Sequence, residues 1–217
     1  GETVRTQRYR MHSNGELFDV LNDRGEHHDV SKEKPALAER LSNALAEWSG
    51  TIEPKPDRPT RPFPLGHPDA VWTQLPARDA TFTGSIQRSN RFPNCTYLLN
   101  WSDTTSEITW DVDVLADGTF EVEMYYACPA GQTGSTIELS VGDATLVAKI
   151  KTPSESPLVG AEEDRVERQE GYVRRWNPMT LGQIQLSKGL GKLRLNATEL
   201  VGNEVAEMRL LMFRRVE

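Results

Sequence analysis

The stretch EITWDVDVLADGTFEVEMYYACPAGQTGSTIELSVG, residues 107–142, decides how the rest of the chain is interpreted. Apolar and polar residues alternate in three runs, which begin at Ile108, Phe120 and Ile137. A period of two residues is typical of strands with one buried face. The pair Asp117-Gly118 between the first two runs favours a hairpin turn. We therefore predict the middle of a β-sandwich here, with a core that includes Trp110, Phe120, Val122 and Tyr126.

Short runs of the same kind continue on both sides of this stretch and are separated by turn signals rich in glycine. About nine short strands over about 145 residues are typical of a jelly-roll sandwich. The predicted strands are 81–86, 96–101, 108–114, 119–127, 136–141, 145–151, 179–186, 192–197 and 208–216. Residues 154–175 are polar and show no period, so we expect a long loop that holds at most one short helix.

The first third of the chain follows a different pattern. Apolar runs on both sides of the turn Ser13-Asn14-Gly15 predict a hairpin over residues 3–20. Pro35 then opens, and Gly50 ends, a segment of helical period, so we predict an amphipathic helix of about 15 residues. Its apolar stripe is Leu37, Leu41, Ala44, Leu45 and Trp48. A hairpin and one helix are too small to fold alone, so this face needs a covering partner.

The segment 51–68 contains six prolines and predicts a stiff linker that cannot sit inside a sheet. The sequence therefore divides into a small subdomain (residues 1–50), a proline-rich linker (51–68) and a mainly β accessory domain (69–217).

The composition narrows the classes of partner. The chain has 217 residues and a net charge of -7, which argues against non-specific binding to nucleic acid. No apolar run approaches the roughly 20 residues that span a bilayer, so no membrane partner is expected. The chain opens Gly1-Glu2-Thr3, without Met or a signal-peptide pattern, which suggests a piece of a longer protein. Cys95 and Cys128 either form one disulfide or stay free.

Several polar groups could either form a functional site or be ordinary solvent-exposed side chains. Asp111 and Asp113 share one face of a predicted strand, where they form either an acid–base pair or, as we expect, a solvated surface. The acidic run 162–164 lacks the ligand spacing of a calcium loop. The adjacent His27 and His28 lack the spacing that turns two rings toward one metal. We therefore predict no catalytic residue and no metal site in this chain.

The run from Gly15 to Pro35 resembles the C-terminal end of arylsulfatase-type sulfatases. The matching residues are Leu17, Asp19, Asp23, Gly25, Glu26 and Pro35. That family converts the Cys or Ser of a C/S-x-P-x-R motif to formylglycine and uses calcium, and no proline here has that context. The resemblance implies a sulfatase parent, whose catalytic domain would be a partner and whose location would be extracellular or periplasmic. The chain itself is expected to be no enzyme and to hold no cofactor.

Residues 108–126 and 186–195 (LSKGLGKLRL) are similar to galactose-binding-like jelly rolls, a group that includes family 6 and family 35 carbohydrate-binding modules. In those modules, a loop aromatic before the late strands and an Asn before the closing strand often contact sugar. The matching positions are Tyr172 or Trp176, and Asn203. The group's structural calcium uses a Glu in an Ala-Glu pair, but this chain has Ala80-Thr81 instead, so calcium is not expected.

Two hypotheses follow for the β domain. In the first, it is a non-catalytic module that binds polysaccharide, including sulfated glycans, since aromatic faces cover sugar rings while amides and acids bind the hydroxyls. In the second, it is a purely structural module that packs against the parent's catalytic domain, and its Trp and Tyr side chains only fill the core.

Overall fold

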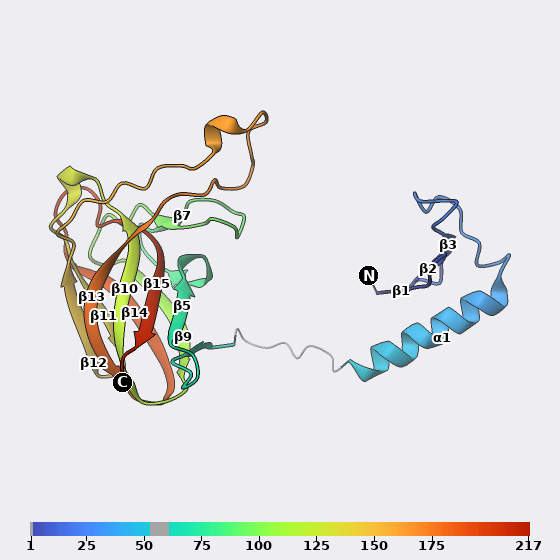
Figure 1. Ribbon diagram of the computed structural model, residues 1–217, viewed down its shortest axis with the longest axis horizontal. Coiled ribbons are helices and arrows are strands. Elements are labelled where there is room, and N and C mark those ends of the chain that lie inside the picture. Colours follow the sequence, from blue (N-terminus) through green and yellow to red (C-terminus); the bar gives the residue numbers. More distant parts are fainter. Residues whose placement is uncertain (1, 53–60) are drawn as a thin grey trace. The chain divides into compact units, whose positions relative to one another are not determined.

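The computed structural model describes residues 2–52 and 61–217. The chain divides into two compact units, one up to Pro59 and one from Thr60, which we call the N-terminal unit and the sandwich (Figure 1). Each unit is described by itself. Among the described residues, no helix is both long enough and apolar enough to cross a membrane.

The N-terminal unit is a three-stranded antiparallel sheet and one helix. The strands are β1 (Thr3–Arg5), β2 (Tyr9–His12) and β3 (Leu17–Asp19). The predicted hairpin over residues 3–20 is present as β2 and β3, but its first arm is divided into two strands, β1 and β2. The Thr6 side-chain oxygen accepts a hydrogen bond from the backbone N–H of Tyr9 at 2.9 Å, which closes a turn and splits the run into two strands.

The helix α1 (Pro35–Thr51) begins at the predicted proline and confirms the predicted amphipathic helix. Leu41 and Leu45 are buried. Leu41 joins a small apolar cluster with Met11, Leu17 and Val30. Trp48, at the end of the predicted stripe, remains 55% exposed.

Two acidic side chains, Asp19 at the end of β3 and Glu26 after it, contact basic residues in and next to β2. Asp19 accepts hydrogen bonds from Arg8 at 2.6 and 2.9 Å, and Glu26 accepts one from Arg10 at 2.5 Å and contacts His12 at 2.8 Å. The hydrogen bond from Arg8 lowers the pKa of Asp19 to about 2. These two acids, both in the sulfatase-like motif, therefore act as structural contacts inside the unit.

The sandwich consists of two sheets that face each other. The β10 sheet has the order β13 (Asn177–Leu186), β10 (Gly118–Ala127), β15 (Glu207–Arg215), β8 (Leu98–Leu99) and β7 (Gln87–Arg88), with β5 (Trp72–Pro76) paired to β15. The β9 sheet has the order β12 (Ala144–Lys149), β11 (Thr136–Val141), β14 (Gly189–Glu199), β9 (Glu107–Val114) and β4 (Phe63–Leu65), with β6 (Thr81–Phe82) paired to β9. From β9 onward the chain passes repeatedly between the sheets, which confirms the predicted jelly-roll sandwich.

The core lies between the two sheets, where the predicted alternation places it. Trp110, Phe120, Val122 and Tyr126 are each at most 2% exposed, as expected. The indole Nε1 of Trp110 donates to the carbonyl oxygen of Pro76 at 3.0 Å, so this buried ring has a partner for its one donor. Asp111 points the other way and pairs with Lys192 at 2.6 Å on the solvent face.

The predicted linker of residues 51–68 needs correction. Thr51 ends α1, and residues 53–60 lie outside the described residues. Phe63–Leu65 form β4, which pairs in parallel with β9 and includes Pro64, so part of the segment sits in a sheet. A proline is tolerated there because β4 is the last strand in the order of its sheet and leaves one edge unpaired. The sandwich thus begins before residue 69.

The long loop between β12 and β13 confirms the prediction for residues 154–175. Its only regular element is a short 3₁₀ turn, Ala161–Glu163. It projects from one end of the sandwich, and the C-terminus lies at the other end (Figure 1). Both cysteines are free: Cys95 is half-buried and Cys128 is buried, so the disulfide left open by the sequence is not formed.

Candidate ligand-binding site

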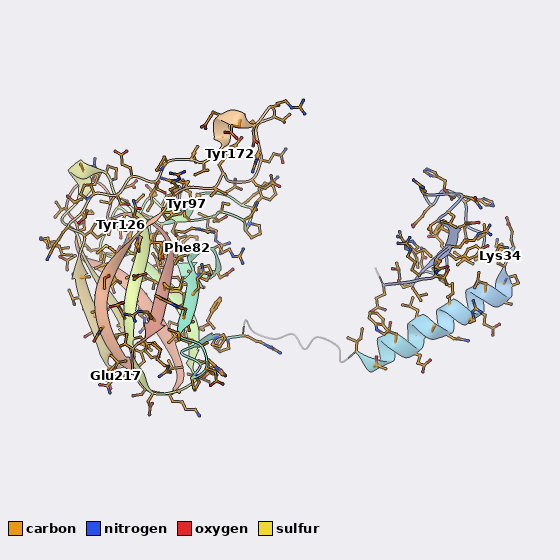
Figure 2. The ribbon with its side chains drawn as sticks, viewed as in Figure 1. Lys34, Phe82, Tyr97, Tyr126, Tyr172 and Glu217 are labelled. Carbon is orange, nitrogen blue, oxygen red and sulfur yellow. The ribbon has the colours of Figure 1, made fainter. Side chains whose placement is uncertain are left out.

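Aromatic side chains gather at the loop end of the sandwich. Figure 2 shows Tyr97 and Tyr126 at this end and Tyr172 on the long loop, while Glu217 lies at the opposite end. Trp176 directly precedes β13 and Tyr97 directly precedes β8, and the strands β10 and β15 separate those two in the sheet. Their ring centroids are nevertheless 5.1 Å apart, so both side chains reach across the intervening strands.

The guanidinium group of Arg174 contacts both rings of this aromatic pair. Its guanidinium carbon lies 4.7 Å from the ring centroids of both Tyr97 and Trp176. One end group pairs with the Glu207 carboxylate at 2.7 Å, and Nε donates to the carbonyl oxygen of Ser156 at 2.7 Å. Cation–π contacts and charge-assisted hydrogen bonds fix the planar group in one orientation. We call Tyr97, Arg174, Trp176 and Glu207 the arginine cluster. Arg174 occupies part of the Trp176 surface, so only the remaining part can meet a ligand.

Tyr172 belongs to a different group of contacts. Its hydroxyl accepts the backbone N–H of Arg168 at 3.3 Å, and the Arg168 guanidinium lies 5.3 Å from its ring centroid. Arg168 also pairs with Asp164, and that hydrogen bond lowers the pKa of the Asp164 carboxyl. Tyr172 therefore organises the outer part of the long loop. Of the two aromatic positions predicted from the sequence, Trp176 is the one that joins the arginine cluster.

Asn203 lines a pocket of about 500 Å³ beside the arginine cluster, which we call the Asn203 pocket. Its walls are the ends of β10 and β15 and the base of the long loop. The hydrogen-bonding side chains in the wall include Gln132, Glu155, Arg174, Asn203, Glu204 and Glu207. The structure thus brings Asn203 and Arg174 into one wall, and Trp176 packs against that arginine.

The backbone around Asn203 is held in place by Gln132. The side-chain oxygen of Gln132 accepts the N–H groups of Asn203 at 2.5 Å and of Glu204 at 3.4 Å. Gly202 has φ +84°, and a Cβ there would lie 2.2 Å from the same oxygen, so only glycine permits this approach. In the described part of the chain, the Asn203 amide side chain makes no hydrogen bond of its own, which leaves it free for a ligand.

The sequence did not single out Arg174, Gln132 or Glu207. A signal for Arg174 was present, since Arg174 and Trp176 are two residues apart on an extended segment, and this spacing places their side chains on the same side. The roles of Gln132 and Glu207 depend on contacts with residues far away in sequence, which no local pattern encodes.

Other groups give less support for chemistry. Burial raises the pKa of the Cys128 thiol, which disfavours its nucleophilic thiolate form. Within residues 2–52 and 61–217, no three His, Cys, Asp or Glu side chains are placed to hold a metal ion. The arrangement at the loop end is suited to hydrogen bonding and ring contact.

No protein-family model and no curated protein sequence matches the chain. Similar solved structures include a GH26-CBM35 β-(1,4)-mannanase of Podospora anserina, with TM-score 0.47 and 10% identity over 67% of this chain and 28% of that one. The C-terminal CBM6 of a marine laminarinase of Zobellia galactanivorans has TM-score 0.45 and 10% identity over 66% and 98%. A family 35 carbohydrate-binding module of Clostridium thermocellum has TM-score 0.44 and 18% identity over 66% and 98%. The chain spans about a quarter of the length of the mannanase.

Proposed function

We propose that the sandwich is a non-catalytic module that binds carbohydrate in the Asn203 pocket. One observation carries the proposal: Arg174 lines a pocket with free hydrogen-bonding side chains, and its guanidinium also lies over the aromatic ring of Trp176. Sugars need both features, because their hydroxyl groups require partners while their C–H faces pack on aromatic surface. A rigid aromatic also loses little conformational entropy when a ligand binds.

The pocket residues offer different hydrogen-bonding groups to a sugar. The Asn203 amide offers both a donor and an acceptor, so it can bind a pair of sugar hydroxyls. Glu155 and Glu204 offer acceptors, and Arg174, already neutralised by Glu207, contributes donors with little net charge. This balance suits the neutral part of a glycan. The proposal gives the chain no catalytic residue and no cofactor of its own.

The finer form of the proposal concerns the longer protein. The sulfatase-like run from Gly15 to Pro35 supports a sulfatase parent, extracellular or periplasmic, that would use calcium and formylglycine in its own catalytic domain. The sandwich would then hold sulfated polysaccharide close to that domain and raise the effective substrate concentration without new chemistry. The partners are a glycan and the parent's catalytic domain.

The arginine cluster also favours a second candidate, a purely structural module. Arg174 connects the base of the long loop to β15 through Glu207 and to a second loop residue through the carbonyl oxygen of Ser156. Such contacts would stabilise the loop without any ligand. Binding experiments separate the two candidates, because a structural module has no reason to leave the Asn203 amide free.

The test is calorimetry of the whole chain with a panel of neutral and sulfated oligosaccharides. We expect Asn203→Ala to weaken binding of the preferred sugar about tenfold, the effect of one lost hydrogen-bonding group. The matched control is Asn196→Ala, a half-buried Asn on β14, which should bind like the unaltered chain. If no sugar binds, the structural candidate replaces the binding module; if sugar binds both variants equally well, the Asn203 pocket is not the binding site.

A further inference from the structure

A second cavity lies along the side of the sandwich, where β12 and β13 form neighbouring edges of the two sheets. Its volume is about 640 Å³. Lys149 and Lys151 both line it, and none of its lining residues is Asp or Glu. The chain as a whole has 32 acidic and 25 Lys or Arg residues, so an acid-free cavity with two lysines runs against the average charge. We call it the lysine cleft.

The rest of the lining supplies hydrogen-bond groups on a fixed frame. Thr152, Ser154, Asn177 and Thr180 contribute polar side chains. The buried Tyr126 hydroxyl donates to the carbonyl oxygen of Thr152 at 2.6 Å, which holds the segment after β12 against the core. The Asn177 amide donates to the Ser154 hydroxyl oxygen at 3.3 Å, and that hydroxyl donates to the carbonyl oxygen of Tyr126 at 3.1 Å.

The two ammonium groups are weakly engaged. Lys149 has one ion pair in the described chain, with Glu199 at 3.9 Å, and the side chains are 48% and 56% exposed. An exposed pair at that distance contributes little. Lys151 forms no ion pair with any described residue. Apolar walls beside them, from Met179 and Leu181, lower the local dielectric and concentrate the field of the two cations. An anionic group would meet charge, donors and partial shelter in the same place.

We infer that the lysine cleft is a second subsite, which takes the anionic substituent of an acidic glycan, a sulfate ester or a carboxylate. This inference rests on the proposed function and adds to it a class of ligand. Ser154 lines both the lysine cleft and the Asn203 pocket, so the two sites adjoin, and the inference places one oligosaccharide across both. The Asn203 pocket carries Glu155 and Glu204, which repel an anion, so the neutral residue lies there and the charged one lies in the cleft.

The experiment compares three oligosaccharides of one backbone: neutral, sulfated and uronate-containing. The unaltered chain should bind one or both acidic forms more tightly than the neutral form, and the tighter acidic form identifies the source of the anion. The double variant Lys149→Gln with Lys151→Gln should lose this preference, about tenfold in affinity, and keep its affinity for the neutral form. The matched control, Lys188→Gln with Lys192→Gln, changes the net charge equally on the β13–β14 turn and on β14, and should keep the preference.

The outcomes separate this inference from the proposed function. Equal affinity of the unaltered chain for neutral and acidic forms overturns the cleft while the Asn203 pocket stands, and so does an equal loss in both double variants. If none of the oligosaccharides binds, the proposed function fails. In that case an NMR titration with inorganic sulfate decides the cleft alone. Shifts at the Thr152 and Thr180 amides that vanish in the Lys149/Lys151 variant support an anion site, and their absence overturns it.

Discussion

Four buried residues form the apolar cluster of the N-terminal unit, whereas thirty form that of the sandwich. The sandwich gains its stability chiefly from apolar area removed from water, at about 25 cal/mol per Å². The N-terminal unit has little such area, and its partly exposed ion pairs, such as Arg8–Asp19 and Arg10–Glu26, add only modest stabilisation. The two units should therefore respond differently to core truncation, backbone strain and acid.

The largest expected effect is that of Trp110→Ala. The ring is 2% exposed, and its removal leaves a cavity and an unpaired Pro76 carbonyl group in the sandwich. Loss of a buried Trp costs about 3–5 kcal/mol of unfolding free energy. Urea unfolding followed by circular dichroism measures it. Trp48→Ala, at a ring that is 55% exposed, should cost no more than about 0.5 kcal/mol, and equal losses would contradict the contrast between the units.

Leu41→Ala tests the small cluster of the N-terminal unit. Its loss costs about 2–5 kcal/mol, which is a large share of the stability of so small a core. We expect the amides of α1 to lose protection from hydrogen exchange while those of β9 and β10 keep theirs. Arg40→Ala, at the exposed neighbouring position, serves as the control. Faster exchange in β9 as well would show that the two units do not respond separately.

Alanine substitutions at two glycines of positive φ separate backbone strain alone from backbone strain combined with a steric clash. Gly84 has φ +69°, and an added Cβ would lie 2.0 Å from the Ser106 hydroxyl oxygen; Gly15 has φ +94° and nothing within 4 Å. A left-handed alanine alone costs about 1–3 kcal/mol. Thermal unfolding should show a larger loss for Gly84→Ala, because the clash adds to that strain. A larger loss for Gly15→Ala would mean that packing around Gly84 yields easily.

The smallest effect concerns acid. Because the folded pKa of Asp19 is about 2, below the usual value near 4, its ionised form stabilises the N-terminal unit. This contribution is complete above about pH 4 and is lost as the pH falls toward 2. Asp19→Asn should flatten the acid dependence of N-terminal NMR signals, and Asp111→Asn in the sandwich should leave it unchanged. A slope that survives Asp19→Asn would assign the acid response to other carboxyls.

The sequence predicted those strands whose alternation reports burial on one face. The bounds of β9, β10 and β11 agree with the predicted ones to within one residue, because each strand has one face in the core. The strands β4 and β5 were missed, since both are short, contain proline and lack alternation. Their conformation is set by pairing with β9 and β15, which are distant in sequence.

The candidate site was predicted only in part, for a related reason. Asn203 and Trp176, which match sugar-contacting positions of the resembled modules, both lie at the loop end of the sandwich; their contact with sugar stays a prediction. Arg174 was missed because its contacts are made with Tyr97, which directly precedes β8, and with Glu207 of β15. A local pattern cannot show that three strands bring these groups within contact distance.

The proline in β4 has a consequence for how copies of this protein behave in concentrated solution. Strands at the end of a sheet present unpaired N–H groups that can recruit another chain and start aggregation. Pro64 in β4 and Pro178 in β13 lie in end strands of the two different sheets, and neither residue has an N–H group to offer. Each interrupts the row of donors that a foreign strand would need. The two prolines should therefore disfavour the addition of a foreign strand at β4 and at β13, whereas β12 and β7, the opposite ends of the two sheets, contain no proline.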